Sequence, residues 1–247
     1  MKTKLEKEIA NRYAVIHEKN KREIVLLRGN GCSWRKCRFC DYHLDYSVDI
    51  EENDRLNVAE LSKITGIYKK VEIINSGSFT ELSSTTMHAI ESVCIEKGIQ
   101  EVHFECHYTL REHIQALRQR FAKLNIQVVV KIGVETFDSL FRESYLDKGI
   151  TTDDPAEIAL YFDECCLLQG IPGQTTESMI YDIETGLTHF QRVCVNIMQS
   201  NGKPIKPAPH IIELFTNTVY PKYANNPRVD ILTEDTAFGV GGVTTNE

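Results

Sequence analysis

The chain has 247 residues, of which 42% are hydrophobic and 26% are charged. This composition excludes a disordered chain and suits one α/β domain with a substantial core. No stretch reaches the ~18 consecutive apolar residues of a membrane helix, and no apolar run follows the lysine-rich start as it would in a signal peptide. We therefore expect a cytoplasmic protein. The formal net charge of −7 argues against a general binder of tRNA or other nucleic acid.

Short apolar runs alternate with segments of helical spacing along most of the chain. This alternation predicts parallel strands joined by right-handed helical crossovers. The predicted strands are Ile24–Leu27, Val71–Ile74, Glu101–Glu105, Gln127–Ile132, Cys165–Leu168 and Val193–Ile197. The predicted helices cover about 54–70, 84–97, 110–124, 138–146, 154–162 and 175–190. The segment 154–162 has room for only about two helical turns.

The expected fold is a partial (β/α)6 barrel of the TIM type over residues 1–198, beginning with an N-terminal helix. After Ser200 the alternation stops, and several prolines and a glycine-rich end, 239–242, follow. We interpret residues 199–247 as a C-terminal cap or extension on the barrel. Ligands of such sheets collect where the strands end.

Eight cysteines is a high count, and Cys32, Cys37 and Cys40 lie within nine residues after the first predicted strand. In a long cytosolic chain such a triplet indicates metal rather than disulfides. Three thiolates can bind three irons of a cubane cluster and leave the fourth iron open. A structural zinc site would need a fourth protein ligand, which His43 could supply. The other cysteines are interpreted as small buried hydrophobes: Cys94, Cys106, Cys165, Cys166 and Cys194.

With this triplet the chain resembles the radical S-adenosylmethionine superfamily. The commonest family spacing, C-x3-C-x2-C, has one residue fewer between its first two cysteines. The family also has an aromatic residue before the last cysteine, and Phe39 stands there, where it would pack beside the adenine. The resemblance implies that Cys32, Cys37 and Cys40 hold a 4Fe–4S cluster. This cluster would cleave S-adenosylmethionine to a radical that takes hydrogen from a substrate.

Three further segments match the family, each after the expected strand. They are Asn75–Ser78, Gly133–Thr136 and Gly170–Thr175. Each alone would be an ordinary turn, but their order along the chain is that of the family. The cofactor-binding residues that the resemblance implies are Phe39, Ser76, Gly77, Ser78, Glu135, Ile171 and Gly173.

The cluster loop and Asn75–Phe79 also resemble the branch that contains the archaeosine-forming radical enzyme, which acts in tRNA modification. Because this chain is compact and acidic, we expect a small free substrate instead, a 7-deazaguanine base cleaved at a C–N bond. The N1–H and exocyclic amine of such a base require a carboxylate, and its O6 requires a donor. The catalytic candidates are Glu105, His103, Asp163 and Glu164.

Three other interpretations stay open. The first is a non-catalytic zinc-binding module, and the second is a radical enzyme that acts on tRNA. The third is an activase that makes a glycyl radical on a partner protein, although the extra cysteine set of a ferredoxin-like insert is absent from the sequence. The radical interpretation implies an electron donor such as flavodoxin or ferredoxin.

Overall fold

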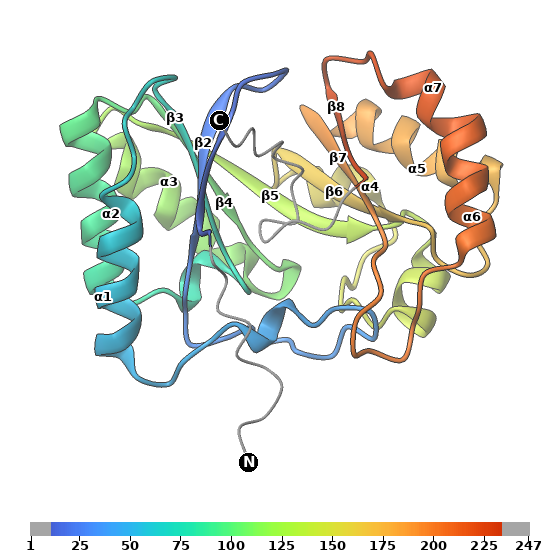
Figure 1. Cartoon of the computed structure of the whole chain (residues 1–247), viewed down its shortest axis with the longest axis horizontal. Coiled ribbons are helices and arrows are strands. Elements are labelled where there is room, and N and C mark those ends of the chain that lie inside the picture. The colour runs from blue at the N-terminus through green and yellow to red at the C-terminus, as the bar shows by residue number, and fades with distance from the viewer. Residues whose placement is uncertain (1–10, 234–247) are drawn as a thin grey trace.

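The computed structural model describes residues 11–233, which form a curled, open half-barrel with helices on its outer face (Figure 1). The strands lie in one sheet in chain order. Their bounds are β1 Tyr13–Ile16, β2 Arg22–Leu27, β3 Lys70–Asn75, β4 Glu101–Glu105, β5 Gln127–Glu135, β6 Glu164–Gln169, β7 Arg192–Ile197 and β8 Val229–Leu232. β1 pairs antiparallel with β2, and every later pair is parallel. Among the described residues β1 and β8 are the two free edges.

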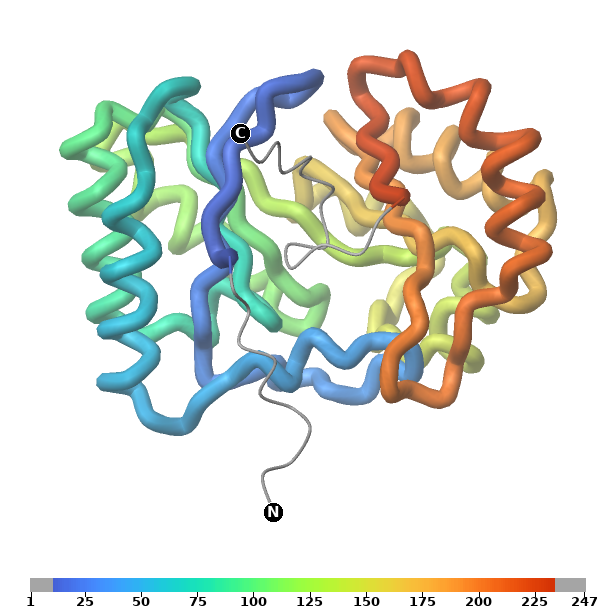
Figure 2. Tube along the Cα trace, viewed as in Figure 1, coloured from blue at the N-terminus to red at the C-terminus, as the bar shows by residue number. Residues whose placement is uncertain are grey.

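Helices connect the parallel strands and cover one face of the sheet (Figure 2). They are α1 Ile50–Leu61, α2 Ser84–Lys97, α3 Ile114–Ala122, α4 Pro155–Ala159, α5 Thr176–His189, α6 Pro209–Leu214 and α7 Tyr220–Tyr223. Local chemistry sets their ends. At α2, for example, the Ser83 side chain accepts from the Thr86 N–H, and Gly98 ends the helix with a left-handed φ of 62°. In residues 11–233 no helix combines the length and apolarity needed to span a membrane.

The predicted partial barrel is confirmed, and the six predicted strands are β2 to β7. The short crossover before β6 is also confirmed, because α4 has only five residues. The helix expected over 54–70 is displaced: Asp49 caps it at Ile50, and it ends at Leu61. The segment expected as a helix over 138–146 contains a single π-helical turn, Phe141–Tyr145.

The two edge strands, β1 and β8, were not predicted. The predicted N-terminal helix falls largely on residues 1–10, which lie outside the described residues, as does the glycine-rich end at 239–242. The division into residues 1–198 and 199–247 stays a prediction. In the described part of the second segment, α6 and α7 lead into β8, which lengthens the sheet beside β7.

The main apolar core lies between the sheet and the helices. Its strand residues come from the outward-facing positions, where side chains alternate with those that face the inside of the half-barrel. Val25, Ile73, Phe104, Leu167 and Val195 are each 1% exposed or less. The helical layer thus fixes the strands and leaves their inner face and their ends for other chemistry.

Candidate active site

The cysteine loop follows β2 and lies across the end of the half-barrel. Cys32, Cys37 and Cys40 are all free thiols and only partly buried. The pKa of Cys40 is raised to about 12, chiefly by burial, while Lys148 opposes the rise and the neighbouring Cys37 adds to it. Burial likewise raises the pKa of Cys37, and Cys32 adds to this effect. The three thiols are therefore electrostatic neighbours in one loop, a donor set that fits an iron–sulfur cluster.

The zinc alternative has no geometric support. Among residues 11–233 no three His, Cys, Asp or Glu side chains converge to hold one metal ion. A zinc site requires such convergence, whereas a cubane cluster takes each thiolate at a different iron. His43, the fourth ligand considered, instead has its Nε2 atom 3.5 Å from Lys203 Nζ.

A buried lysine stands at the centre of the predicted cofactor residues. Lys148 Nζ lies 2.8 Å from Glu135 Oε1 and 5.7 Å from the centre of the Phe39 ring. Its charge also lowers the pKa of Cys37 and Cys40 against the effect of burial. The structure thus brings Glu135, Phe39 and the cluster thiols together around one cation. The sequence analysis missed Lys148 because it belongs to no family motif that we used.

The loop after β3 packs directly against the cysteine loop. The Glu81 carboxylate accepts from the Ser33 N–H and the Ser78 N–H, each at 2.5 Å. A Cβ atom on Gly77 would lie 3.0 Å from Cys32 Cα and would also collide with the Glu81 carboxylate. Glycine is therefore required at this contact. Ser76 is half-buried, with its Oγ 3.4 Å from Asp45 Oδ2.

Trp34 anchors the cysteine loop to the loops after β4 and β5. Its ring stacks on His107 with centroids 5.3 Å apart, and its Nε1 donates to the Asp147 carbonyl at 2.8 Å. His107 Nε2 is 2.8 Å from the Lys148 carbonyl, and the His107 N–H donates to Ser78 Oγ at 2.9 Å. These bonds fix the cluster loop relative to Ser78 and Lys148.

The predicted adenine side is an apolar cluster at the ends of β6 and β7. Phe39 packs there with the buried Ile171, together with Leu146, Leu168, Met198 and Ile205. Gly173 lies in the turn after β6 with a φ of 95°, which favours glycine. The predicted cofactor residues from three loops therefore surround the cysteine loop. Their individual roles stay predictions.

The inner face of the half-barrel carries a buried charge network. Lys131 on β5, with 4% of its side chain exposed, pairs with Glu72 and lies 3.3 Å from Glu105. Arg22 pairs with Glu72 at 2.5 Å. Burial would raise the pKa of Glu72, but Arg22 and Lys131 hold it well below its usual range. For Glu105 burial dominates and raises the pKa, although Lys131 opposes this and 32% of the side chain is exposed.

A second group of charges adjoins the first. His103 Nε2 lies 2.7 Å from Glu101, and its Nδ1 lies 3.4 Å from Glu164. Arg192 is 3.8 Å from the other oxygen of Glu164. Lys131 is the register partner of both Glu105 and Glu164. Three predicted catalytic residues, Glu105, His103 and Glu164, thus lie on one inner surface with Lys131, which the sequence analysis missed.

Asp163 does not join this group. Its carboxylate accepts from Arg118 and from the Val130 N–H, each at 2.8 Å, just before β6 begins. The expectation of a buried hydrophobic cysteine is wrong for Cys166, which is only half-buried. It lies at the same register as Cys194 and packs with the inner-face cluster of Ile24, Leu26 and other residues.

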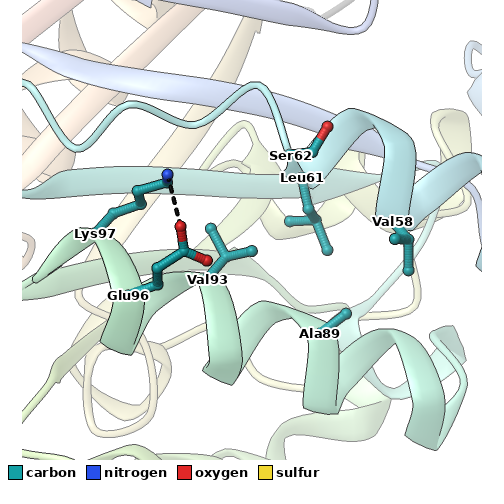
Figure 3. A pocket seen from close by; sticks show the side chains of 7 residues that line it. All are labelled: Val58, Leu61, Ser62, Ala89, Val93, Glu96 and Lys97. Atoms are coloured by element: carbon teal, nitrogen blue, oxygen red, sulfur yellow. Dashed lines mark hydrogen bonds and ion pairs between the residues drawn. The ribbon is translucent and has the colours of Figure 1, made fainter.

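A groove of about 170 Å³ lies between α1 and α2 on the outside of the molecule (Figure 3). Its lining is mostly apolar, with Val58, Leu61 and Val93, and with the ion pair between Lys97 and Glu96 at one end. The cysteine loop and the inner face contribute no residue to it. It is a feature of the helical layer, separate from the candidate site.

Comparison with solved structures identifies the relatives of this half-barrel. The structure of queuine lyase from Clostridium spiroforme bound to SAM and queuine is 43% identical, with a TM-score of 0.87. The match covers 94% of this chain and 99% of that chain. A protein described as a sporulation-specific glycosylase from Bacillus subtilis has 10% identity and a TM-score of 0.32, too low to carry an argument. No protein-family model matches, and the sequence matches none of the curated proteins searched.

The three-cysteine loop at the end of an open parallel half-barrel, together with this match, defines a radical S-adenosylmethionine enzyme. More specifically, the chain belongs to the queuine lyase family, since the identity is high and extends over nearly the whole of both chains. The expectation drawn from the cysteine triplet and the three later motifs is thereby confirmed at the level of the family.

Proposed function

We propose that this protein is a lyase that cleaves queuine at the C–N bond to its cyclopentenediol and releases 7-aminomethyl-7-deazaguanine. The observation that carries the proposal is the 43% identity, across nearly both entire chains, with a queuine lyase bound to SAM and queuine. The net charge of −7 further supports a free base over tRNA as substrate. The activity belongs to queuine salvage, and we propose the cytoplasm, where thiols stay reduced, as its location.

In this proposal Cys32, Cys37 and Cys40 ligate the cluster. When bound, the cluster and S-adenosylmethionine supply the one-electron cleavage and the hydrogen abstraction. The chain positions the cofactor: Phe39 and Ile171 would pack against the adenine, and Glu135 would accept from the ribose. Lys148 would hold the Glu135 carboxylate in place through their 2.8 Å ion pair.

The loop after β3 completes the cofactor site. Ser76, Gly77 and Ser78 would receive the methionyl end of the cofactor, and Gly173 would let the backbone approach the adenine closely. The support is the close approach of the two loops: a Cβ atom on Gly77 would lie only 3.0 Å from the Cα atom of Cys32, a proposed cluster ligand.

The inner face would bind the deazaguanine. Glu105 is the carboxylate that would accept from N1–H and the exocyclic amine, and the neighbouring Lys131 would donate to O6. Lys131 also favours the ionised form of Glu105, the form that accepts both bonds. His103 and Glu164 lie deeper on the same face and would orient the diol and the secondary amine.

The direct test starts with anaerobic reconstitution to about four irons per chain, as a cubane cluster requires. The protein is then reduced with dithionite and incubated with S-adenosylmethionine and queuine. We expect mass spectrometry to detect 5′-deoxyadenosine and 7-aminomethyl-7-deazaguanine in step. If queuine neither binds nor stimulates 5′-deoxyadenosine formation, the proposed substrate is wrong.

Glu105→Gln tests the substrate carboxylate. The amide keeps the size of the side chain but loses one acceptor, so a base donor stays unpaired in a partly dry site. The loss should be about 1–3 kcal/mol, or about 5- to 150-fold in kcat/KM. Glu112→Gln, at an exposed carboxylate after β4, is the matched control and should behave as wild type. Equal activity of both variants would remove Glu105 from the site.

A further inference from the structure

Glu135, the residue proposed to accept from the ribose, ends β5 in an unusual backbone conformation. Its φ of 70° lies in the left-handed region, which a residue other than glycine adopts only at a cost in free energy. The register between β5 and β6 shifts at the same place, between Gly133 and Glu135. Such an irregularity redirects the side chains beside it. The groups that hold this turn therefore determine where the Glu135 carboxylate points.

The Glu135 carboxylate lies in a closely packed position over its own strand. A Cβ atom on Gly133 would lie 2.5 Å from Glu135 Oε1 and 2.9 Å from Lys148 Nζ, so a side chain there would collide with this ion pair. Both members of the pair are largely buried. A change in the backbone at residue 135 would therefore move the carboxylate away from Lys148 and out of this position.

The peptide bond between Thr136 and Phe137 is held at both of its polar groups by buried charged side chains. Asp182 Oδ1 accepts from the Phe137 N–H at 2.7 Å, and it also accepts from Thr136 Oγ1 at 3.1 Å. Arg142 Nη1 donates to the Thr136 carbonyl at 3.5 Å. Asp182 and Arg142 are each 1% exposed, so water does not compete for these bonds. They fix the chain directly after Glu135.

Asp182 is the one of these two charges that reaches the turn from a distant element. It lies on α5 in the outer helical layer (Figure 1), 46 residues along the chain from Thr136. Burial of a carboxylate costs free energy, and an apolar side chain would pack into this layer at less cost. Because the hydrogen bonds of Asp182 go to the residues that follow Glu135, this cost indicates a role in the turn rather than in the core.

We propose that Asp182 is a positioning residue for S-adenosylmethionine, which holds the turn after β5 in the conformation that directs the Glu135 carboxylate to the cofactor. The inference rests on the proposed function, because it requires Glu135 to accept from the ribose. Asp182 itself would not touch the cofactor. It acts through Thr136 and Phe137, and its loss would let the strained backbone at Glu135 relax.

The test measures the binding of S-adenosylmethionine to the reconstituted but unreduced holoenzyme by calorimetry, so that no cofactor is cleaved. The variants are Asp182→Ala, Asp182→Asn, Glu135→Ala and the double variant Glu135→Ala/Asp182→Ala. The matched control is Glu184→Ala on the same helix, which loses a hydrogen bond from Tyr223 Oη, at 2.5 Å, that has no link to the turn. Iron content and circular dichroism verify that each variant is loaded and folded.

We expect Asp182→Ala to raise the Kd for S-adenosylmethionine about tenfold, because the loss of the buried acceptor frees the turn. Asp182→Asn keeps the Oδ1 acceptor and should restore the wild-type Kd to within about twofold. Glu184→Ala should bind the cofactor as wild type does, even if it is less stable. Glu135→Ala should raise the Kd at least as much as Asp182→Ala. In the double variant the loss of Asp182 should add nothing further, because Asp182 acts only through Glu135.

Wild-type affinity in Asp182→Ala would overturn the proposal. Additive losses in the double variant, or an unchanged Kd in Glu135→Ala, would also overturn it, because Asp182 would then not act through Glu135.

A second variant serves if Asp182→Ala does not fold. Thr136→Val removes the hydroxyl that donates to Asp182 but keeps the shape of the side chain. It should weaken binding about threefold or more, and again not beyond the loss in Glu135→Ala. An unchanged Kd in Thr136→Val would count against the proposal in the same way. No readout uses queuine, so a failure of the positioning role is distinguishable from a failure of the proposed lyase activity.

Discussion

The two faces of the half-barrel sheet differ in chemistry, although alternate residues of the same strands form them. On β5, Lys131 faces inward to Glu72 and Glu105, and the next residue, Ile132, is buried in the apolar layer under the helices. Apolar burial on the outer face stabilises the fold directly. Buried ion pairs on the inner face contribute little net stability, which supports the substrate site that we propose there.

The largest effect is expected at Gly77, where the loop after β3 packs against the cysteine loop. Gly77→Val should abolish 5′-deoxyadenosine formation, because its side chain would collide with Glu81 and approach Cys32. The iron content should stay at about four per chain, since the cysteines are unchanged. Gly202→Val is the control, as no heavy atom lies within 4 Å of its Cβ position. Normal cofactor cleavage in Gly77→Val would show that the segment is only a turn.

Two adjacent residues of β4 give the sharpest test of the comparison. Phe104 faces outward, with ring centroids 6.0 Å from Phe79 and 5.5 Å from Phe121. Phe104→Ala should reduce the free energy of unfolding by about 3–5 kcal/mol in urea titrations. The KM for queuine of the folded fraction should not change. Glu105→Gln should do the opposite, with loss of kcat/KM and stability within about 1 kcal/mol of wild type. If both variants lose stability, or both lose kcat/KM, the contrast between the outer and inner faces is wrong.

Lys131→Met removes the cation that lies against both Glu72 and Glu105 on the inner face. The variant leaves Glu105 without its nearest cation, while Glu72 keeps Arg22. Loss of one partner from a buried pair should cost about 3 kcal/mol in the free energy of unfolding. Queuine binding should weaken as well, as measured by calorimetry with the unreduced holoenzyme. Lys123→Met, an exposed control, should stay within about 0.5 kcal/mol of wild type. A stable Lys131→Met that binds queuine normally would contradict the role given to the network.

The contrast between local patterns and long-range contacts explains which features the sequence could predict. β2 to β7 were predictable because they alternate with helical segments, whereas β1 pairs antiparallel with β2 with no helix between them and β8 has only four residues. The cysteine triplet was predictable because its members lie in one loop. The pairing of Lys131 with Glu72 joins residues 59 positions apart, and no local pattern indicates such a contact. For the same reason Asp163 was grouped with Glu164 as a carboxylate at a strand end, although it bonds instead with Arg118 and the Val130 N–H.

Asp182 is a buried carboxylate on the mostly apolar outer side of the sheet. Its substitution gives the smallest of the predicted effects. This carboxylate on α5 is 1% exposed. Its Oδ1 accepts from the Phe137 N–H at 2.7 Å and from Thr136 Oγ1 at 3.1 Å, while Oδ2 has no hydrogen-bond partner among the described residues. Burial therefore raises the pKa of Asp182 to about 7, against the effect of these hydrogen bonds. The inner-face Glu72, which is equally buried but paired with two cations, shifts in the opposite direction.

The raised pKa sets the sign of a pH effect on stability. The ordinary pKa of an aspartate is about 3.9, so between about pH 4 and 7 the folded protein keeps a proton that the unfolded chain has lost. This contribution to the free energy of unfolding is complete below about pH 4 and is lost as the pH rises toward 7.

Asp182→Asn stays neutral at every pH and keeps the Oδ1 acceptor. In urea titrations the variant should therefore exceed wild type by about 1–3 kcal/mol at about pH 8, and the difference should shrink by about pH 5. Asp153→Asn, at an exposed carboxylate, should follow the wild-type profile. Parallel profiles for Asp182→Asn and wild type would mean that Asp182 is ionised throughout, and that the outer layer tolerates an unpaired charge as well as the inner face tolerates its paired ones.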